Sequence, residues 1–459
     1  MTIPTNDTYI SRKKRLFPWF ICGLAALFYC YEYFLRITPS VMTHELMSQF
    51  QINATQLGNL AAFYYYAYDP MQLPVGMMMD RFGPRRLLTL ACIICALGTF
   101  LFTMHVLSIA QFGRFMVGFG SAFAFVGVLK LATIWLPPER FGMVAGMLTA
   151  MGMLGAMGGD IALASLVQAI GWSTTVAITS ILGLILAVIM WLVIRDHSHR
   201  SRRVEKQAAL SAKELFAGAF NILRNPQIWL NGFVACCLFL PLTALAELWG
   251  ISYAQEAYNL TKVDAATAIS MLFLGFAIGG TTIGWISDRI RRRCLPLIIG
   301  GIISALLSAV LFYVRGLPTP LVFILLLLIG VFASAQVLCF AVASEISQRR
   351  LAGTAIAVTN LFTMLGGVVF QPLIGKLLDT HWDGKIINGV HYYSVQDYNF
   401  ALAVVPIGLT LGALAACLLT ETRASYKHAL DNEDMLHFHH EHEAVNLTNN
   451  SHLVSENPK

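Results

Sequence analysis

The sequence predicts an all-α membrane protein with twelve transmembrane helices, arranged as two pseudo-symmetric bundles of six. Of the 459 residues, 57% are hydrophobic and only 12% are charged, whereas soluble domains carry about 25% charged residues. The apolar residues gather in long blocks, and a helix needs roughly 20 such residues to cross a bilayer. The chain also resembles itself at offsets of 208 and 211 residues, which indicates two related halves.

Apolar blocks between charged or Pro/Gly-rich breaks give the helices in chain order. Six begin in the first half, near Phe17, Thr55, Leu87, Ala110, Phe141 and Ser173. Six begin in the second half, near Ile228, Asp264, Leu295, Pro320, Leu351 and Asn399. The expected organisation is an N-terminal segment (1–16), a first bundle (17–195), a linker (196–226), a second bundle (227–420) and a disordered tail (421–459).

Basic residues predict the orientation, because Lys and Arg crowd into cytoplasmic loops. Of 31 such residues, 24 fall on the side that holds the N-terminus, the linker and the tail. Three lie within spans, and four fall opposite, namely Lys262, Arg315, Lys376 and Lys385. We therefore expect both termini in the cytoplasm, and the net charge of +6 gives no reason to expect a nucleic-acid partner. The basic start could open a signal peptide, but no small-residue cleavage site follows, so a retained first helix is expected.

The tail carries the run HFHHEHE, with His437, His439, His440 and His442. A metal site there would need further ligands to complete a coordination shell, and no second cluster is present in the sequence. We expect neither a metal nor a cofactor.

The most specific local pattern follows the second helix. There GMMMDRFGPRR supplies Gly76, Asp80, Arg81, Gly83 and Arg85. A second copy, GWISDRIRRR, follows the eighth helix 208 residues later and supplies Gly284, Asp288 and Arg289. Glycines let helix ends approach, while the aspartate can pair with arginines or with an opposing helix N-terminus in one conformation only. Cytoplasmic positive charge would explain the arginines alone, so the pattern predicts a conformational latch.

A second repeat links the fifth and eleventh helices. GMLGAMGGD at 152–160 aligns without gaps onto TMLGGVVFQ at 363–371, which is 211 residues further on. The two loops and this echo together predict two parallel six-helix repeats, and transporters built this way bind substrate between the halves.

The first loop resembles the G-x-x-x-D-R-x-G-R-R signature of the major facilitator superfamily, and RFMVGFG at 114–120 resembles that superfamily's fourth-helix motif. The resemblance implies the major facilitator fold, with access switched by rocking of the halves. It also implies that Arg114 holds the first helix or couples protonation to movement.

Charged side chains inside spans are functional candidates, because each costs at least ~2.5 kcal/mol on insertion scales. Glu32 and Arg36 are four residues apart on the first helix and can pair on one face. The alternative is a structural ion pair near the surface, from which Arg36 could snorkel. Lys130 lies ~10 Å before Pro137 and needs a partner, an anion or a snorkelling path. Asp69 is expected to act in packing or in a gate.

Asp160 follows two glycines at a close helix contact. Glu247 follows Pro241, and the preceding backbone carbonyl that this proline leaves without a donor could help to line a pocket. Gln336, Asn360 and Gln371 are neutral candidates. In the superfamily the first, fourth, seventh and tenth helices line the cavity. The resemblance therefore places five of these residues along the cavity, namely Glu32, Arg36, Lys130, Glu247 and Gln336. Such mixed charge suits a zwitterionic substrate, with a cation facing its carboxylate and an acid facing its ammonium group.

YEYFLRITPSVM in the first helix and FVGVLKLATIWLPPERF in the fourth resemble the bacterial intraphagosomal amino-acid transporters (phagosomal transporters) of intracellular pathogens such as Legionella. This resemblance implies import of an amino acid across the bacterial inner membrane, coupled to protons carried by Glu32, Asp160 or Glu247. We expect a monomer.

Two alternatives stay open. One is an organic-anion or sugar-acid symporter, because Arg36-x-x-Pro39 also resembles the first helix of those relatives. The other is a nutrient receptor that does not transport. No G-x-x-x-x-G-K-[ST] loop and no catalytic constellation occur in the sequence, so we expect neither an ATP-driven pump nor an enzyme.

Overall fold

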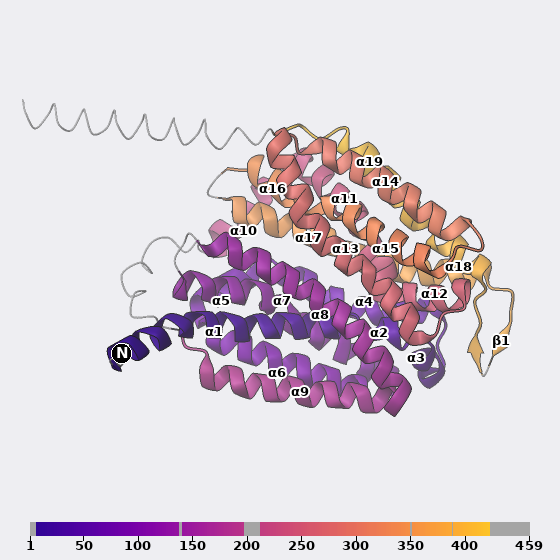
Figure 1. Cartoon of the computed structure of the whole chain (residues 1–459), viewed down its shortest axis with the longest axis horizontal. Coiled ribbons are helices and arrows are strands. Elements are labelled where there is room, and N and C mark those ends of the chain that lie inside the picture. The colour runs from indigo at the N-terminus through magenta and orange to yellow at the C-terminus, as the bar shows by residue number, and fades with distance from the viewer. Residues whose placement is uncertain (1–5, 137–139, 197–211, 349–350, 388, 423–459) are drawn as a thin grey trace, which may run out of the picture.

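The structure, a computed structural model, describes residues 6–136, 140–196, 212–348, 351–387 and 389–422. Within them the chain is almost entirely helical, and the first half lies beside the second, with most helices running along the long axis (Figure 1). The predicted all-α membrane fold is confirmed.

The first half contains the helices expected there, each beginning within a few residues of its predicted start. The apolar part of the first helix begins at Phe17, although the helix itself starts earlier. The elements are α1 (Asn6–Arg36), α4 (Ala54–Met71), α5 (Pro74–Phe82), α6 (Pro84–Phe102), α7 (Leu107–Trp135), α8 (Phe141–Ile170) and α9 (Trp172–Val193).

The second half repeats this arrangement, but three of its spans are composite. The first is α11 (Pro226–Leu240), η3 (Pro241–Trp249) and α12 (Gly250–Tyr258); the fourth is α15 (Thr319–Ala333), η4 (Ser334–Val337) and α16 (Leu338–Glu345); the sixth is α18 (Val395–Leu402) and α19 (Val404–Ala416). The remaining three are α13 (Lys262–Ile290), α14 (Cys294–Tyr313) and α17 (Ala352–His381).

Among the described residues, 11 helical segments are long and apolar enough to cross a membrane. The remaining expected span, the second, is divided into α4 and α5 at Gln72 and Leu73. Pro70 lies in the last turn of α4 and Pro74 begins α5. Proline has no backbone N–H to donate, so two of them within five residues interrupt the helical hydrogen bonds.

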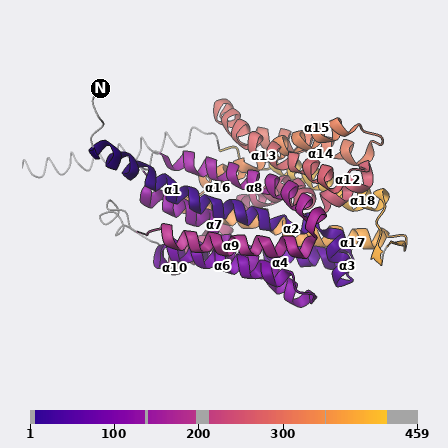
Figure 2. The ribbon, with the colours of Figure 1, turned by 60° about the horizontal axis from the view of Figure 1, so that its bottom comes forward.

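The two ends of the molecule differ. At one end, which we call the linker end, α5 leads into α6 and α10 (Ala212–Leu223) leads into α11. At the other, the hairpin end, lie α2 (Thr38–Val41), α3 (Thr43–Phe50) and an antiparallel pair, β1 (Ile386–Ile387) with β2 (Val390–His391). Figures 1 and 2 both show α3 and α18 at the hairpin end and α10 at the linker end. The sequence reasoning did not predict these short elements.

The halves meet along two pairs of helices, α4 with α17 and α8 with α13. Small residues bring the first pair together. A Cβ added at Gly58 would collide with the backbone of Gln371, and one at Gly375 would collide with the backbone of Ala54. The interface therefore depends on backbone approaching backbone, as helix contacts in membranes commonly do.

Several predictions concern residues outside the described ranges. They include most of the linker (197–211), the tail from residue 423 with its histidines, and the basic pair Arg349 and Arg350. The domain boundaries stay predictions.

Candidate functional site

Arg36 ends α1 and is the centre of a buried charged cluster. Its side chain is 2% exposed, and Glu32, one turn earlier, is fully buried. The Glu32 Oε1 atom lies 2.8 Å from Nη2 and 3.2 Å from Nε of Arg36. The pair expected from the i, i+4 spacing therefore forms inside the protein, and Arg36 does not snorkel to a surface.

Tyrosines surround the guanidinium. The Tyr64 hydroxyl accepts a hydrogen bond from Arg36 Nε at 3.1 Å and donates one to Glu32. The Arg36 Cζ atom lies 4.5 Å from the ring centroid of Tyr33 and 5.1 Å from that of Tyr68. Aromatic faces attract a desolvated cation, so these rings stabilise Arg36 in its charged form.

The second half supplies the other acid. Glu247 Oε1 is 3.8 Å from Arg36 Nη1, and the Tyr65 hydroxyl donates to the same carboxylate. Glu247 lies on η3, the π-helical stretch that begins at Pro241. A π-helical stretch changes the direction of side chains relative to an α-helix and is often found at functional sites. The cluster thus joins the two halves through opposite charges.

Arg114 on α7 holds the end of α1. Its guanidinium donates to the carbonyl oxygens of Leu35 at 2.8 Å and of Arg36 at 3.2 Å. The last carbonyls of a helix have no partner within the helix, and Arg114 satisfies two of them. This contact joins α7 to the end of the first span.

Lys130 does not join the cluster. Its Nζ atom pairs with Asp80 Oδ1 at 2.7 Å, and both side chains are partly exposed near the linker end. The placement of Lys130 along the cavity, drawn from family resemblance, is corrected by this contact. The depth of Lys130 did require a partner, but the partner is the aspartate of the loop motif, which only the packing of α5 against α7 brings within reach.

Two other buried acids stand apart from Arg36. Asp160 is 0% exposed and accepts one hydrogen bond, from Ser40 Oγ at 3.3 Å, while its second oxygen has no partner among the described residues. Asp69 is 4% exposed, and neither of its oxygens has a partner there. An ionised carboxylate without partners is costly to bury, so both are candidates to take up a proton.

The neutral candidates make hydrogen bonds in the C-terminal half or between the halves. Gln336 donates to Thr363 Oγ1 at 3.1 Å, and Gln371 donates to the Thr243 carbonyl at 3.3 Å. Asn360 reaches across to Gln72 at 2.9 Å. They lie in or beside the irregular stretches of the spans, where backbone groups need side-chain partners.

The first loop motif is held within its own half. The backbone N–H of Arg85 donates to Asp196 Oδ1 at 2.7 Å, and its guanidinium donates to the Trp191 carbonyl. Gly83 has φ of 82°, a backbone conformation that favours glycine. Arg81 packs over the ring of Phe82.

The second motif is likewise local. Asp288 pairs with Arg293 at 2.6 Å, and Arg293 pairs with Glu345 at 2.9 Å. Arg289 packs over the ring of Trp285. The close helix approach expected at Gly76 and Gly284 is not seen among the described residues, because a Cβ at either glycine would meet none of their atoms within 4 Å.

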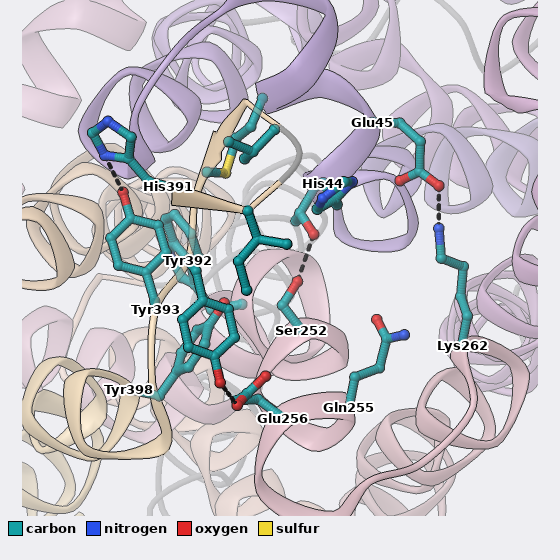
Figure 3. A pocket seen from close by; sticks show the side chains of 15 residues that line it. His44, Glu45, Ser252, Gln255, Glu256, Lys262, His391, Tyr392, Tyr393 and Tyr398 are labelled. Carbon is teal, nitrogen blue, oxygen red and sulfur yellow. Dashed lines mark hydrogen bonds and ion pairs between the residues drawn. The ribbon is translucent and has the colours of Figure 1, made fainter. Parts of the chain in front are cut away.

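A cavity of about 350 Å³ lies at the hairpin end, between α3 of the first half and α12, α18 and the hairpin of the second (Figure 3). Three side-chain contacts join its walls: the ion pair of Lys262 with Glu45, and the hydrogen bonds of Thr43 with Ser252 and of Tyr392 with Glu256. The hydrogen bond to Glu256 raises the pKa of Tyr392 to about 12, so the phenol keeps its proton and donates. The cavity does not include Arg36, and Trp249 lines its wall. Sequence reasoning missed it, because its residues come from stretches of the chain that are far apart in the sequence.

Two six-helix halves with a charged cluster buried between them are the architecture of a large class of membrane transporters. The chain belongs to the Major Facilitator Superfamily, whose family model matches residues 21–371. It is therefore a multi-pass membrane protein of a family of secondary transporters, which in general are not enzymes.

Two curated relatives from a bacterium illustrate the similarity. The chain is 26% identical over 388 residues to the membrane sensor protein UhpC of Escherichia coli, covering 78% of this chain and 86% of that protein. It is 24% identical over 398 residues to a probable L-galactonate transporter of the same species, covering 82% and 86%. A bacterial homologue of the human lysosomal transporter Spinster, solved inward-facing and occupied, shares the fold with a TM-score of 0.74 at 16% identity, covering 88% of this chain and 97% of that one.

Proposed function

We propose that this chain is a proton-coupled importer of a small organic acid, and that Arg36 is the group that binds the substrate carboxylate. The observation that carries the proposal is the position of Arg36, buried between the halves and already engaged by Glu32 and Glu247. Arginine binds carboxylates through paired N–H donors, so a substrate carboxylate can replace these side chains.

Competition for Arg36 supplies the coupling to protons. While Glu32 and Glu247 are ionised, they hold the guanidinium and resist an incoming anion. A proton on either carboxylate weakens its attraction to Arg36 and frees donors for the substrate. Proton and substrate then each favour the binding of the other, by the reciprocity that governs linked sites. Asp69 and Asp160 are further candidate carriers.

Two observations support an acid of the sugar-acid kind. One relative is named as a probable transporter of L-galactonate, an acid that carries several hydroxyl groups. The cluster also offers hydroxyl partners, from Tyr64 and Tyr65, beside the guanidinium. With Lys130 bound to Asp80 at the linker end, Arg36 is the cation placed to meet the substrate carboxylate.

An amino acid is the second candidate. Its carboxylate would bind Arg36, and its ammonium group would face Glu32 or Glu247, both of which lie within 4 Å of that guanidinium. The resemblance of the first and fourth spans to phagosomal amino-acid transporters supports this reading.

We further propose that the chain works as a monomer in the bacterial inner membrane, with the linker end in the cytoplasm. The support is the distribution of its basic residues. The bundle, linker and tail boundaries given above belong to this proposal.

Ligand binding and flux test the proposal together. Purified protein is screened by thermal shift against L-galactonate, D-glucarate and several L-amino acids, and those that bind are followed into proteoliposomes containing a pH-sensitive dye. We expect a sugar acid to stabilise the protein and to enter with protons. Stabilisation by amino acids alone would select the second candidate, and binding without flux would indicate a sensor.

Arg36→Lys is the decisive variant, because lysine keeps the charge but lacks the paired donors. We expect its affinity for the acid to fall at least about tenfold, the scale of one charge-assisted hydrogen bond. Arg315→Lys, at an exposed position outside the spans, is the matched control and should bind normally. Normal binding by Arg36→Lys would contradict the proposed anchor.

A further inference from the structure

At the hairpin end, a carboxylate of the second half binds a helix N-terminus of the first. Asp379, in the last turn of α17, accepts hydrogen bonds from the backbone N–H of Ala54 at 3.2 Å and of Thr55 at 2.8 Å. The Thr55 hydroxyl donates to the same carboxylate at 2.5 Å. The first N–H groups of a helix lack partners within it and carry partial positive charge, so they attract an anion. Asp379 thus ties α17 to the start of α4.

Neighbouring groups complete this contact. The Tyr393 hydroxyl donates to Asp379 Oδ1 at 2.5 Å and accepts from the Ala54 N–H at 3.1 Å. Gly375, one turn before Asp379, lies where a Cβ would collide with the Ala54 carbonyl. The approach of the two helices is therefore built into the sequence of α17, and it spans the two halves of the molecule.

The linker end has an equivalent aspartate, but in this conformation it binds a residue of its own half. The span formed by α4 and α5 runs antiparallel to α17, since Gly375 lies against Ala54 and Asn360 donates to Gln72. This span too carries an aspartate near its C-terminal end, Asp80. In this conformation Asp80 pairs with Lys130 of its own half. A Cβ at Gly353, in the first turn of α17, would meet no atom of the described residues within 4 Å. Each span of the pair thus carries an aspartate near its C-terminal end, and one of the two, Asp379, binds the first turn of its partner.

We propose that Asp379 is a positioning residue of the transport cycle, which holds the hairpin end closed and alternates with Asp80 at the opposite end. When the halves rock, the start of α4 leaves Asp379 while the start of α17 comes within reach of Asp80. The proposal concerns the conformational equilibrium alone and holds for any substrate.

Hydrogen–deuterium exchange of the full chain in lipid nanodiscs tests it. Asp379→Asn keeps the shape of the side chain and removes its charge. We expect exchange of the backbone amides at 54–57 to rise about tenfold, the scale of one hydrogen bond to a charged group. We also expect exchange at 352–355 to fall, since molecules that open at the hairpin end close at the linker end. A purely local cap would not produce that second change.

Asp383→Asn is the matched control. Asp383 lies just after the end of α17, is exposed, and accepts a local hydrogen bond from the N–H of Lys385. The exchange pattern of the Asp383→Asn variant should match that of the parent chain. Thr55→Val removes one donor of the contact and should shift both regions in the same directions, more weakly, which provides a test if Asp379→Asn does not fold. Faster exchange at 54–57 without slower exchange at 352–355, or no change at either, would overturn the proposal.

Discussion

At the scale of single residues, the functional cluster depends on a balance of opposite charges that are buried away from water. Arg36 is stabilised by Glu32, by Glu247 and by the rings and hydroxyls of tyrosines. Removing one partner of a buried pair costs about 3–5 kcal/mol, because the other charge is left uncompensated. Each member is therefore constrained by the rest, and small substitutions are more informative here than truncations.

Tyr65→Phe is predicted to slow transport about tenfold without preventing folding. The change removes one hydroxyl, the donor from α4 to Glu247 on the other half. A hydrogen bond to a charged acceptor contributes about 1.5–3 kcal/mol, and Glu247 loses it in the conformation seen here. Initial uptake rates in proteoliposomes, normalised to the amount of reconstituted protein, measure the effect.

The neighbouring Tyr66 provides the control, since its side chain is 39% exposed and it is not a member of the cluster. Tyr66→Phe should transport at the rate of the parent. Equal rates for the two variants would show that the hydroxyl of Tyr65 has no part in the cycle.

At the scale of elements, glycines decide how closely the helices of the first half can pack. Gly118 on α7 lies directly against the backbone of Tyr64 on α4. That contact fixes the depth at which α4 presents Tyr64 and Tyr65 to the cluster. Gly98 and Gly113 similarly bring α6 and α7 together, backbone to backbone. The positions of α4, α6 and α7 therefore depend on glycines, which lack a side chain, as well as on the side chains that pack between the helices.

Gly118→Ala is predicted to destabilise the protein by about 1–3 kcal/mol, the usual penalty for adding a methyl group to a filled contact. Thermal unfolding in detergent should show a lower midpoint, and uptake should fall because Tyr64 and Tyr65 are displaced. Gly23→Ala on α1 is the matched control, since a Cβ at Gly23 would meet no atom of the described residues within 4 Å. A midpoint for Gly118→Ala equal to that of Gly23→Ala would contradict the packing argument.

At the scale of the whole molecule, the two ends are in different states. The hairpin end is joined across the halves by Asp379, by Lys262 with Glu45 and by Thr43 with Ser252. At the linker end, the motif residues Asp80 and Asp288 bind within their own halves. Such asymmetry is what alternating access requires of one end-state.

The orientation in the membrane is testable by labelling. With the linker end in the cytoplasm, a membrane-impermeant maleimide added to spheroplasts should label Asp383→Cys at the hairpin end. Arg86→Cys, exposed near the linker end, should be labelled only after permeabilisation. The parent chain, with its native cysteines, gives the background signal, and the reverse pattern would contradict the orientation.

Much of the architecture followed from the sequence, because hydrophobic length is a local property. The span starts near Leu87, Ala110 and Phe141 could be read within a few residues, since a helix needs roughly 20 apolar residues to cross a bilayer. The pairing of Glu32 with Arg36 was also local, being fixed by helical geometry four residues apart.

Contacts between distant segments were decided by the tertiary structure alone. Lys130 was assigned to the cavity by resemblance, yet α5 brings Asp80 to it. Glu247, on the π-helical stretch after Pro241, reaches Arg36 across the two halves, and the contact of Asp379 with Ala54 needs α17 to lie along α4. Periodicity and hydropathy describe one helix in its solvent. Which helix faces it, and at what depth, follows from the packing of small residues across the whole bundle.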